Sequence, residues 1–459
     1  MIVIYKHRRY NHRKRRRNGE LGHRKKPVVM ITKPKRVPSG PSEKFDPSQD
    51  LLSWLCDHFT QFGNLFKASI YGSDVFVVSD PRYAHYVLRE NWQNYKKGQA
   101  IKRVGLLLGN GLMVSEGEFW KSQRRMIQPA FHSDVMGALL NVITTANVKL
   151  LRKWEDAAQK RGTVNVTRDI SLMILEVVLI SIFGDDYEQV AEPFSILSSE
   201  SARDLQFAQA FRALGKIVVQ IATRRRKESR MCADLLGMLM EARDRETGER
   251  MPDRQLVSEI MTLIVAGHET TASTLNWTWY LLSEHPDVEE KLSRELGSLP
   301  SIEVLELRDF QKLAYTRQVI EETMRLYPAG WLMTRRALRE DKLGDYIVPA
   351  GTEIYISPFL IQRHPDLWTA PERFDPDRFG SEQDQSQHAL AMLPFSAGPR
   401  KCIGESFARI EMQIHMAMIA KSLRLRCVGR TIVELDAGVN LRNKHDFIMV
   451  PEIKAPAVQ

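Results

Sequence analysis

Cys402 is the residue whose neighbours allow most chemistry, and it lies in the stretch PFSAGPRKCIG of residues 394–404. Arg400 and Lys401 flank it, and the segment that follows has apolar residues spaced as on one face of a helix. The thiol is therefore predicted just before a helix N-terminus and among cations, two features that favour the thiolate. A thiolate in such a loop suits a metal ligand or a nucleophile. A buried structural cysteine is the alternative that any lone cysteine offers.

The spacing F-x-x-G-x-R-x-C-x-G in this stretch is formed by Phe395, Gly398, Arg400, Cys402 and Gly404, and it resembles the haem-binding loop of the cytochromes P-450 of the soluble bacterial type. The resemblance implies that Cys402 is the axial metal ligand of a b-type haem and that the other four residues bind the cofactor. It also implies the fold class, mainly α with small β-sheets (α+β), as a helix-rich prism around a buried haem.

The segment LIVAGHETTAST, residues 263–274, looks like the central helix that lies over the distal haem face in this family. Ala266 and Gly267 would leave room for the flat cofactor, while Glu269 and Thr270 place an acid beside an alcohol. A hydroxyl in a helix normally bonds to the carbonyl four residues earlier. The resemblance implies that Thr270 serves instead, with Glu269 and a water, to deliver protons during oxygen activation.

Trp120 and Arg124 lie four residues apart, on one predicted helix face. The pair resembles the W-x-x-x-R element of the family, which binds a haem propionate through the charge-assisted hydrogen bonds of the arginine. By the same matching, Arg400 and, from the weaker local similarity of TRRALRED, Arg336 are expected at the propionates.

Glu322 and Arg325 lie three apart in EETMRLYP, and such a pair alone is usually an exposed ion pair of little value. With Arg373 of PERFDPDRF they resemble the family's E-x-x-R and P-E-R-F elements, which implies a Glu–Arg–Arg triad beneath the haem loop. We therefore predict a structural role for these three residues.

The elements that must position these residues can be read from turn chemistry and periodicity. Residues 65–78 are predicted to form a hairpin, and the pattern from 80 to 338 is mainly helical. Residues 346–357 again have hairpin character, and short strands are predicted at 425–428 and 447–450.

The resemblance also indicates which segments line the substrate pocket: the loop 98–112, Leu263 and Ala266, residues 329–333 and a turn near 445–447. These segments are largely aliphatic, which favours a fatty-acyl, terpenoid or polyketide-like substrate. Only about forty residues lie between 184 and 224, where the family usually has two helices and a loop over the substrate entrance. A short lid is therefore predicted.

The net charge of +10 is concentrated at the start of the chain. Residues 1–26 contain eleven Lys or Arg and one acid, 11 − 1 = +10, so the rest is nearly neutral. We predict a disordered basic arm over residues 1–32, a Pro/Gly linker over 33–43 and one catalytic domain over 44–459. The arm could contact nucleic acid, tether the protein to a membrane surface, or result from a mis-called start before Met30. The last reading, or a tail without function, is favoured.

The four cysteines lie far apart, and a reducing cytoplasm fits this pattern better than a disulfide framework. No apolar run reaches the roughly 18 residues that a transmembrane helix needs. His268 and Glu269 could begin the zinc motif H-E-x-x-H, but Ala272 occupies the position of the second histidine. The zinc reading therefore fails.

Together these features predict a cytoplasmic, monomeric haem-thiolate monooxygenase that inserts one oxygen atom of O2 into an apolar substrate. The sequence has no G-x-G-x-x-G after a strand, so electrons must come from a separate protein. A ferredoxin or flavodoxin with its NAD(P)H reductase is the expected donor. Lys121, Arg125 and Lys401 are expected to form a basic docking patch for that donor.

Two other function classes stay open. A haem-thiolate peroxygenase or isomerase would need no external electrons, although retention of both Glu269 and Thr270 argues against it. A non-catalytic haem-binding sensor, with the basic arm on nucleic acid, would show salt-dependent affinity and no turnover. Nucleic-acid binding is the less expected of these outcomes.

Overall fold

The computed structural model describes residues 35–198, 205–230, 232–299, 306–381, 388–429 and 431–454. The predicted arm, 1–32, lies outside these residues. Among the helices within them, none is both long enough and apolar enough to cross a membrane.

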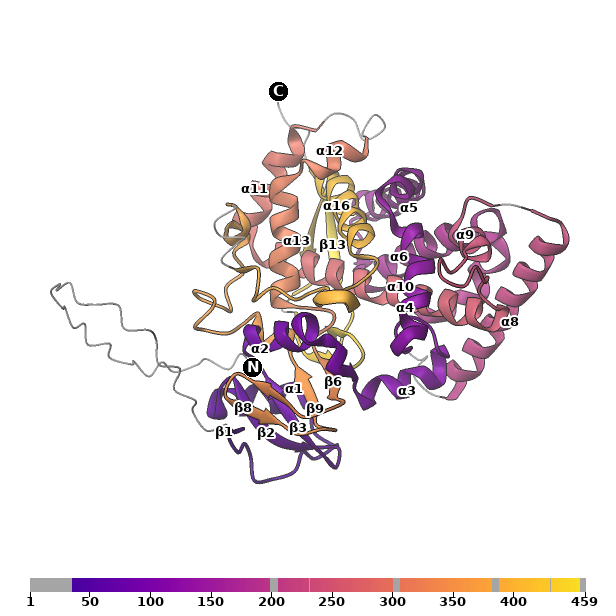
Figure 1. Cartoon of the computed structure of the whole chain (residues 1–459). Helices are drawn as coiled ribbons and strands as arrows, with labels where there is room; N and C mark the ends of the chain where they lie inside the picture. Colours follow the sequence, from indigo (N-terminus) through magenta and orange to yellow (C-terminus); the bar gives the residue numbers. More distant parts are fainter. Residues whose placement is uncertain are drawn as a thin grey trace, which may run out of the picture.

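Helices form most of the molecule and surround one central helix, α10, which is visible in the middle of Figure 1. The α-helices are α1 (Leu51–Phe62), α2 (Pro81–His85), α3 (Gln99–Leu108), α4 (Gly117–Ile127), α5 (Ser133–Gln159), α6 (Val166–Phe183), α7 (Ala191–Phe194), α8 (Leu205–Lys227), α9 (Leu235–Glu241), α10 (Asp253–Glu284), α11 (Pro286–Gly297), α12 (Leu307–Gln311), α13 (Ala314–Leu326), α14 (Pro358–Ile361) and α16 (Glu405–Ser422). Short 3-10 or π turns are η1 (Tyr86–Glu90), η2 (Trp92–Asn94), η3 (Gln128–Phe131), η4 (Gly184–Gln189), η5 (Ser195–Ser198), η7 (Pro376–Phe379) and η8 (Gly398–Arg400).

In the described part of the chain the strands form four small sheets, and the largest lies at the foot of the molecule in Figure 1. The strands are β1 (Lys35–Arg36), β2 (Leu65–Ile70), β3 (Ser73–Val78), β4 (Tyr95–Lys97), β5 (Val164–Asn165), β6 (Met333–Ala337), β7 (Asp341–Leu343), β8 (Tyr346–Val348), β9 (Glu353–Ile356), β10 (Leu423–Cys427), β11 (Leu435–Ala437), β12 (Leu441–Asn443) and β13 (Ile448–Ile453). Their orders are β2-β3-β9-β6-β4, β1-β8-β7, β10-β13-β5 and β11-β12.

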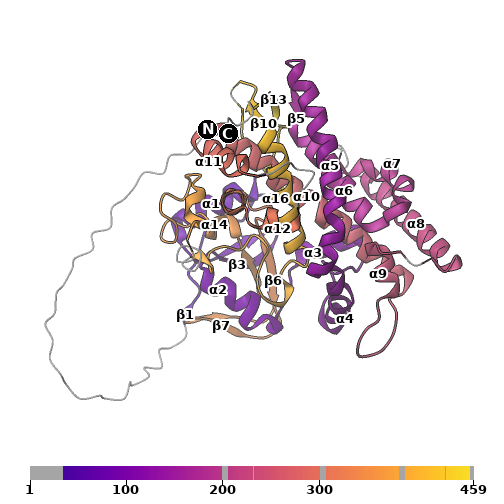
Figure 2. The ribbon, with the colours of Figure 1, turned by 90° about the horizontal axis from the view of Figure 1, so that it is seen from above.

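The central helix is buried around much of its circumference, which explains its weak amphipathic pattern. Ile260 and Leu275 are fully buried in the main hydrophobic core, together with residues of α5, α6, α13 and α16. The view from above shows α6 and α16 on either side of α10 (Figure 2). A rigid, packed helix of this kind can hold polar side chains at defined positions.

The predicted hairpin of residues 65–78 is confirmed, with β2 and β3 paired in antiparallel register around Tyr71 and Gly72. Both turn residues have positive φ, 50° and 76°, which is the backbone twist that a two-residue hairpin turn requires. The predicted strands near the C-terminus are also found, because β10 pairs with β13.

Three expectations need correction. Strands β8 and β9 belong to different sheets, so residues 346–357 do not form a hairpin. Part of the expected linker is bound to the body, since β1 pairs with β8 and Pro38 accepts a backbone hydrogen bond from Lys67 at 2.9 Å. The expected loop 98–112 contains helix α3.

The role of residues 184–224 as a short lid over the substrate entrance stays a prediction. After α6 the chain forms only η4, the four-residue α7 and η5 before residue 198, and one long helix, α8, follows from 205. The C-terminal end of α8 is fixed by a buried ion cluster: Arg225 donates to Asp186 at 2.7 Å and to Asp234 at 2.7 and 2.8 Å. This end of α8 is therefore anchored to the segments that carry Asp186 and Asp234.

Candidate active site

The cysteine loop owes its shape to two residues with positive φ, Ser396 at 64° and Gly398 at 72°. A Cβ at Gly398 would lie 2.1 Å from the Leu88 carbonyl oxygen, so only glycine fits against η1. The Cys402 backbone N–H donates to the Phe395 carbonyl at 3.0 Å and closes the loop. Gly404 is the N-cap of α16, so Cys402 lies just before this helix, as predicted.

The electrostatics of the thiol differ from the sequence expectation. Burial raises the pKa of Cys402, and this effect outweighs the Gly404 N–H and the nearby Arg124 and Lys401, which all lower it. Yet Cys402 is exposed to solvent. Both observations hold for a thiol that lies inside the molecule without protein atoms covering it. Binding to a metal ion deprotonates a thiol outright, so the raised pKa is compatible with a ligand role.

Arg400, in the cysteine loop itself, is largely enclosed by protein. It donates to the Tyr95 carbonyl at 2.6 Å, pairs with Glu116, and lies 5.5 Å from the ring centres of both Trp92 and Trp120. Its Nε atom is buried and has no hydrogen-bond partner in the described structure. An unsatisfied buried donor of this kind indicates a site for an acceptor.

Arg336 is expected beside Arg400, but the structure places its neighbour Arg335 there. Side chains alternate along β6, so Arg335 and Arg336 point to opposite faces of the sheet. Arg335 is buried, and burial together with Arg400 lowers its pKa to about 10. Arg336 lies on the other face, where its Nε is 3.9 Å from Glu353 and it lines a shallow surface cavity.

Lys97, at the end of β4, is a second cation that the sequence did not reveal. Its Nζ donates to the carbonyls of Leu112 and Ser115, both at 2.9 Å, and burial lowers its pKa to about 7. No motif surrounds this lysine, so no local signal could have identified it. Arg335 could have been suggested only by its position beside Arg336.

Trp120 and Arg124 lie on one face of α4, as their spacing predicts. Trp120 is 4% exposed. Arg124 donates to the Lys401 carbonyl at 2.9 Å and so joins α4 to the cysteine loop. The structure therefore brings both residues to the same region as Arg400 and Cys402.

On α10, the Thr270 hydroxyl donates to the Ala266 carbonyl at 2.9 Å. The hydroxyl therefore makes the hydrogen bond to the carbonyl four residues earlier, whereas the resemblance implied that it would not. Its oxygen can still accept a hydrogen bond. The expectation for Gly267 needs correction: a Cβ there would point at Val178 of α6, at 3.4 Å. Gly267 therefore allows α6 and α10 to approach each other.

Glu269 is bonded to the C-terminal part of the chain. Its Oε2 accepts from Asn440 Nδ2 at 2.7 Å, and Asn440 belongs to the turn between β11 and β12. In the turn near 445–447, which is expected to line the pocket, Phe447 is buried against Tyr280 with ring centres 5.2 Å apart.

His268, considered above for a zinc motif, faces α6. Its Nε2 lies 2.8 Å from the Ser171 hydroxyl, and burial lowers its pKa to about 4. Within the described residues no group of three or more His, Cys, Asp or Glu could hold a metal ion.

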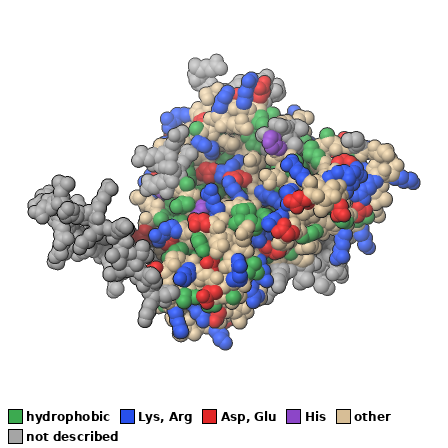
Figure 3. All heavy atoms as spheres, in the orientation of Figure 1, with side chains coloured by type: hydrophobic (Ala, Val, Ile, Leu, Met, Phe, Trp, Pro, Cys, Tyr) green, Lys and Arg blue, Asp and Glu red, His purple; other side chains and the backbone are tan. Residues whose placement is uncertain are grey.

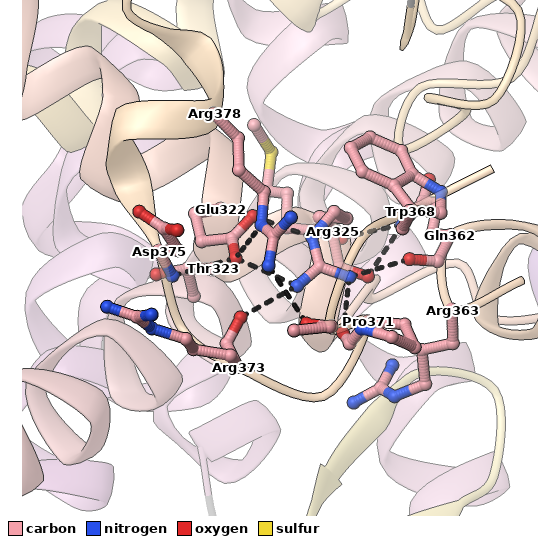
Figure 4. A network of polar contacts seen from close by, with 12 residues as sticks. Glu322, Thr323, Arg325, Gln362, Arg363, Trp368, Pro371, Arg373, Asp375 and Arg378 are labelled. Carbon is pink, nitrogen blue, oxygen red and sulfur yellow. Dashed lines mark hydrogen bonds and ion pairs between the residues drawn. The ribbon is translucent and has the colours of Figure 1, made fainter. Parts of the chain in front are cut away.

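The Glu322–Arg325 pair is fully buried, and Figure 4 shows the network around it. Arg325 donates to both Glu322 oxygens, at 2.6 and 2.8 Å, and to three backbone carbonyls, so all five of its N–H groups are used. The third member is Arg378, whose Nε donates to Glu322 at 3.3 Å. Arg373 offers only its carbonyl, while its side chain is exposed.

The predicted third residue was therefore wrong, for a physical reason. PERF and PDRF follow each other in one irregular segment, and both place an arginine after a proline and an acid. The turn η7 orients Arg378, the arginine of PDRF, toward Glu322 of α13. The Asp375 N–H also donates to Glu322, at 2.9 Å.

The residues present fit a haem. An uncovered thiol lies inside the molecule at the N-terminus of α16. Beside it, three largely buried cations, Arg335, Arg400 and Lys97, surround Glu116, and one buried N–H lacks an acceptor. This excess of donors suits the two carboxylates of the cofactor.

Comparisons with known proteins agree with this reading. Residues 43–205 and 179–446 match the family model Cytochrome P-450. The cyclooctat-9-en-7-ol 5-monooxygenase of Streptomyces melanosporofaciens is 32% identical over 390 residues, which cover 80% of this chain and 84% of the relative. The pentalenene oxygenase of Streptomyces avermitilis is 28% identical and covers 82% and 86%. Protein LUTEIN DEFICIENT 5 of Arabidopsis thaliana is 29% identical and covers 84% and 71%.

Among solved structures, the retinoic acid-bound cyanobacterial CYP120A1 superposes with a TM-score of 0.82 at 23% identity, over 92% of this chain and all of that one. The fold is the helix-rich fold of haem-thiolate oxygenases, and the chain belongs to the cytochrome P-450 family. It is an oxidoreductase, a P-450 monooxygenase, whose cofactor is a haem with a cysteine thiolate as axial ligand of the iron.

Proposed function

We propose that this protein oxygenates a terpenoid, with Cys402 as the axial ligand and electrons from a separate protein. The observation that carries the substrate class is the set of relatives, which includes oxygenases named for cyclooctatenol, pentalenene and carotene. Terpenoids are largely apolar, and the segments expected over the site contribute apolar side chains such as Leu263 and Leu332. Fatty-acyl and polyketide-like substrates are the alternatives.

When bound, the haem supplies the activation of dioxygen, and the protein positions the cofactor and the substrate. We assign Arg335, Arg400, Arg124 and Trp120 to the haem propionates. The support for this assignment is the burial of Arg335 and Arg400 beside Glu116 and the unpartnered Arg400 Nε–H. Trp120 lies against Arg400, and Arg124 donates to the Lys401 carbonyl of the cysteine loop. Phe395, Gly398 and Gly404 would shape the loop behind the ligand, and Ala266 would face the opposite side of the cofactor.

Protons are proposed to pass through Glu269 and Thr270. A hydroxyl can accept a proton from one neighbour and donate its own to another, and a carboxylate can exchange protons with water. In the described state Thr270 donates to Ala266 and Glu269 accepts from Asn440. Thr270 would have to exchange this partner during turnover by rotation of its side chain, whereas a carboxylate can accept from Asn440 and exchange a proton with water at the same time.

The electron donor is proposed to be a ferredoxin or flavodoxin with its NAD(P)H reductase. The expected basic patch is less positive than predicted, because Lys121 pairs with Glu118, Arg125 with Asp244 and Lys401 with Glu405. A surface cavity of about 600 Å³ lies behind the cysteine loop, and it is lined by loop residues 392–399, Lys401, Glu405, Arg409, Arg89, His85 and Ala389. We assign donor docking to this face. We further propose that residues 44–459 act as one cytoplasmic, monomeric catalytic unit.

The central test is the ligand. The purified protein is expected to bind one b-type haem, and its reduced carbon-monoxide complex to have the red-shifted Soret band of thiolate ligation. Cys402→Ala removes the only thiol in the haem loop, so this band should disappear. A variant that kept the band would exclude Cys402 as the ligand.

Substrate class is tested by titrating the ferric protein with terpenoids and with fatty acids of similar size. A terpenoid that binds beside the haem should shift the Soret band, and it should be converted only with NAD(P)H and the donor proteins. Preferential binding of fatty acids would overturn the terpenoid assignment. Conversion by peroxide alone, at a comparable rate, would favour the peroxygenase alternative.

A further inference from the structure

The β11–β12 hairpin is held firmly against two elements of the site. The Leu441 carbonyl accepts from Ser273 Oγ at 2.6 Å and from Trp277 Nε1 at 3.4 Å, both on α10. The Leu441 N–H donates to the Ala329 carbonyl at 2.9 Å, and the Gly438 carbonyl accepts from Trp331 Nε1 at 3.0 Å. The hairpin end therefore cannot move without breaking bonds to α10 or to residues 329–331.

Glu269 extends this line of contacts along α10. Glu269, Ser273 and Trp277 are spaced by four residues, so they lie on one face of the helix, toward the hairpin. The side chain of Asn440 donates its amide N–H to Glu269 Oε2 at 2.7 Å. The acid of the acid–alcohol pair is thus fixed from the same hairpin that is fixed to the helix.

The identity of Asn440 is not explained by the turn. Asparagine is common in turns because it tolerates positive φ, but Asn440 is not among the described residues with positive φ. Its neighbour Val439 is 70% exposed, so the tip as a whole is not packed. The hydrogen bond to Glu269 is therefore the contact that gives this side chain a role.

We propose that Asn440 is a positioning residue for proton delivery: it holds the Glu269 carboxylate on the hairpin side of α10, one residue away from the Thr270 hydroxyl. This inference rests on the proposed function of Glu269. Asn440 itself transfers no proton, because its amide N–H only donates a hydrogen bond. Losing the amide removes one hydrogen bond that holds the Glu269 carboxylate in this position, so fewer electrons would end in product and more in peroxide.

The first measurement needs no substrate. Hydrogen exchange of the peptide covering residues 435–443 is followed in the haem-loaded wild type, Asn440→Ala, Glu269→Gln and the double variant. A hydrogen bond to a charged group is lost in Asn440→Ala, so exchange should accelerate by about tenfold. Lys444→Ala, which removes an exposed ion pair with Glu434 on the same hairpin, is the matched control and should exchange as the wild type.

The second measurement is the fraction of NAD(P)H electrons recovered in product and in peroxide. Asn440→Ala should lose coupling in the direction of Glu269→Gln, and adding it to Glu269→Gln should cause little further loss, since the two residues act together. Coupling equal to that of Lys444→Ala, or losses that add, would overturn the proposal. Absence of the Cys402-dependent spectral band would instead refute the proposed function, and the exchange comparison would still decide whether Asn440 holds Glu269.

Discussion

At the scale of single residues, the cation cluster beside the cysteine loop depends on which face of a strand each arginine occupies. Arg335 is buried next to Arg400, whereas Arg336 lies on the opposite face beside Glu353. Within the described residues the only hydrogen bond of the Arg335 guanidinium is to the Thr334 carbonyl, at 2.9 Å. Such a cation would gain most from a carboxylate of the cofactor.

We therefore predict that Arg335→Ala loses haem faster than the wild type, while Arg336→Ala does not. A charge-assisted hydrogen bond contributes ~2 kcal/mol, which corresponds to a rate increase of about thirtyfold. Transfer of haem to excess apomyoglobin, followed by absorbance, measures this rate. Equal rates for the two variants would contradict the assignment of Arg335 to a propionate.

At the scale of elements, the network around Glu322 joins α13 to the irregular segment before the cysteine loop. Both Glu322 and Arg325 are completely buried, so each charge depends on the other and on the surrounding donors and acceptors. Arg378 is the outer member of this network, and its side chain is 9% exposed.

Arg378→Ala is predicted to lower the thermal midpoint, because it removes one donor from a buried carboxylate; the loss is on the order of 1–3 kcal/mol. Arg373→Ala is the matched control in the same segment, and it keeps the backbone carbonyl that accepts from Arg325. Circular dichroism melting of the haem-loaded proteins measures both. If Arg373→Ala were the more destabilised variant, the network in Figure 4 would not be the one that acts in solution.

The segment between α3 and α4 is held from two sides at Leu112. Its N–H donates to Glu259 of α10 at 2.7 Å, and its carbonyl accepts from Lys97 at 2.9 Å. Burial raises the pKa of Glu259 from 4.5 to about 7. The folded protein therefore binds this proton more tightly than the unfolded chain does.

The resulting stability is present below about pH 4.5 and is lost as the pH rises through 7. Glu259→Gln keeps the size of the side chain and an acceptor for the Leu112 N–H, but it cannot ionise. Between pH 5 and pH 8 the variant should therefore lose less stability than the wild type, and the difference should be ~3 kcal/mol at most. Lys97, whose pKa burial lowers to about 7, interacts electrostatically with Glu259, so the comparison measures the titration of Glu259 together with its effect on Lys97. Parallel melting-temperature curves for the two proteins would contradict a raised pKa of Glu259.

At the scale of the whole molecule, the charge of the described body is balanced. Figure 3 shows Lys and Arg interspersed with Asp and Glu over the visible face. Arg89 is exposed, lines the cavity behind the cysteine loop and has no ion-pair partner among the described residues. Lys121, by contrast, lies 2.6 Å from Glu118.

We predict that Arg89→Glu slows reduction by an acidic ferredoxin more than Lys121→Glu does, because an unpaired cation contributes more to steering. Stopped-flow reduction at low and high salt measures the effect, which should shrink as salt screens exposed charges over about 8 Å at physiological ionic strength. Reduction by dithionite is the control and should be equal in all three proteins. A larger effect at Lys121 would move the docking site toward α4.

The sequence by itself determined those features that depend on spacing within one element. The cysteine before α16, the Trp120–Arg124 pair on α4 and the Glu269–Thr270 pair on α10 all follow from local periodicity, and the family and fold follow from their order. Their catalytic and binding roles stay predictions.

Only the tertiary structure decided which of two equivalent local choices is used. Arg335 rather than Arg336 lies beside Arg400, because the pairing of β6 with β9 and β4 decides which face of the sheet each side chain occupies. Arg378 rather than Arg373 meets Glu322 because an irregular segment has no periodicity from which orientation could be predicted. The pKa of Cys402 rises because desolvation sums over atoms from the whole fold. Asn440 reaches Glu269 from 171 residues away, and no local pattern records such a contact.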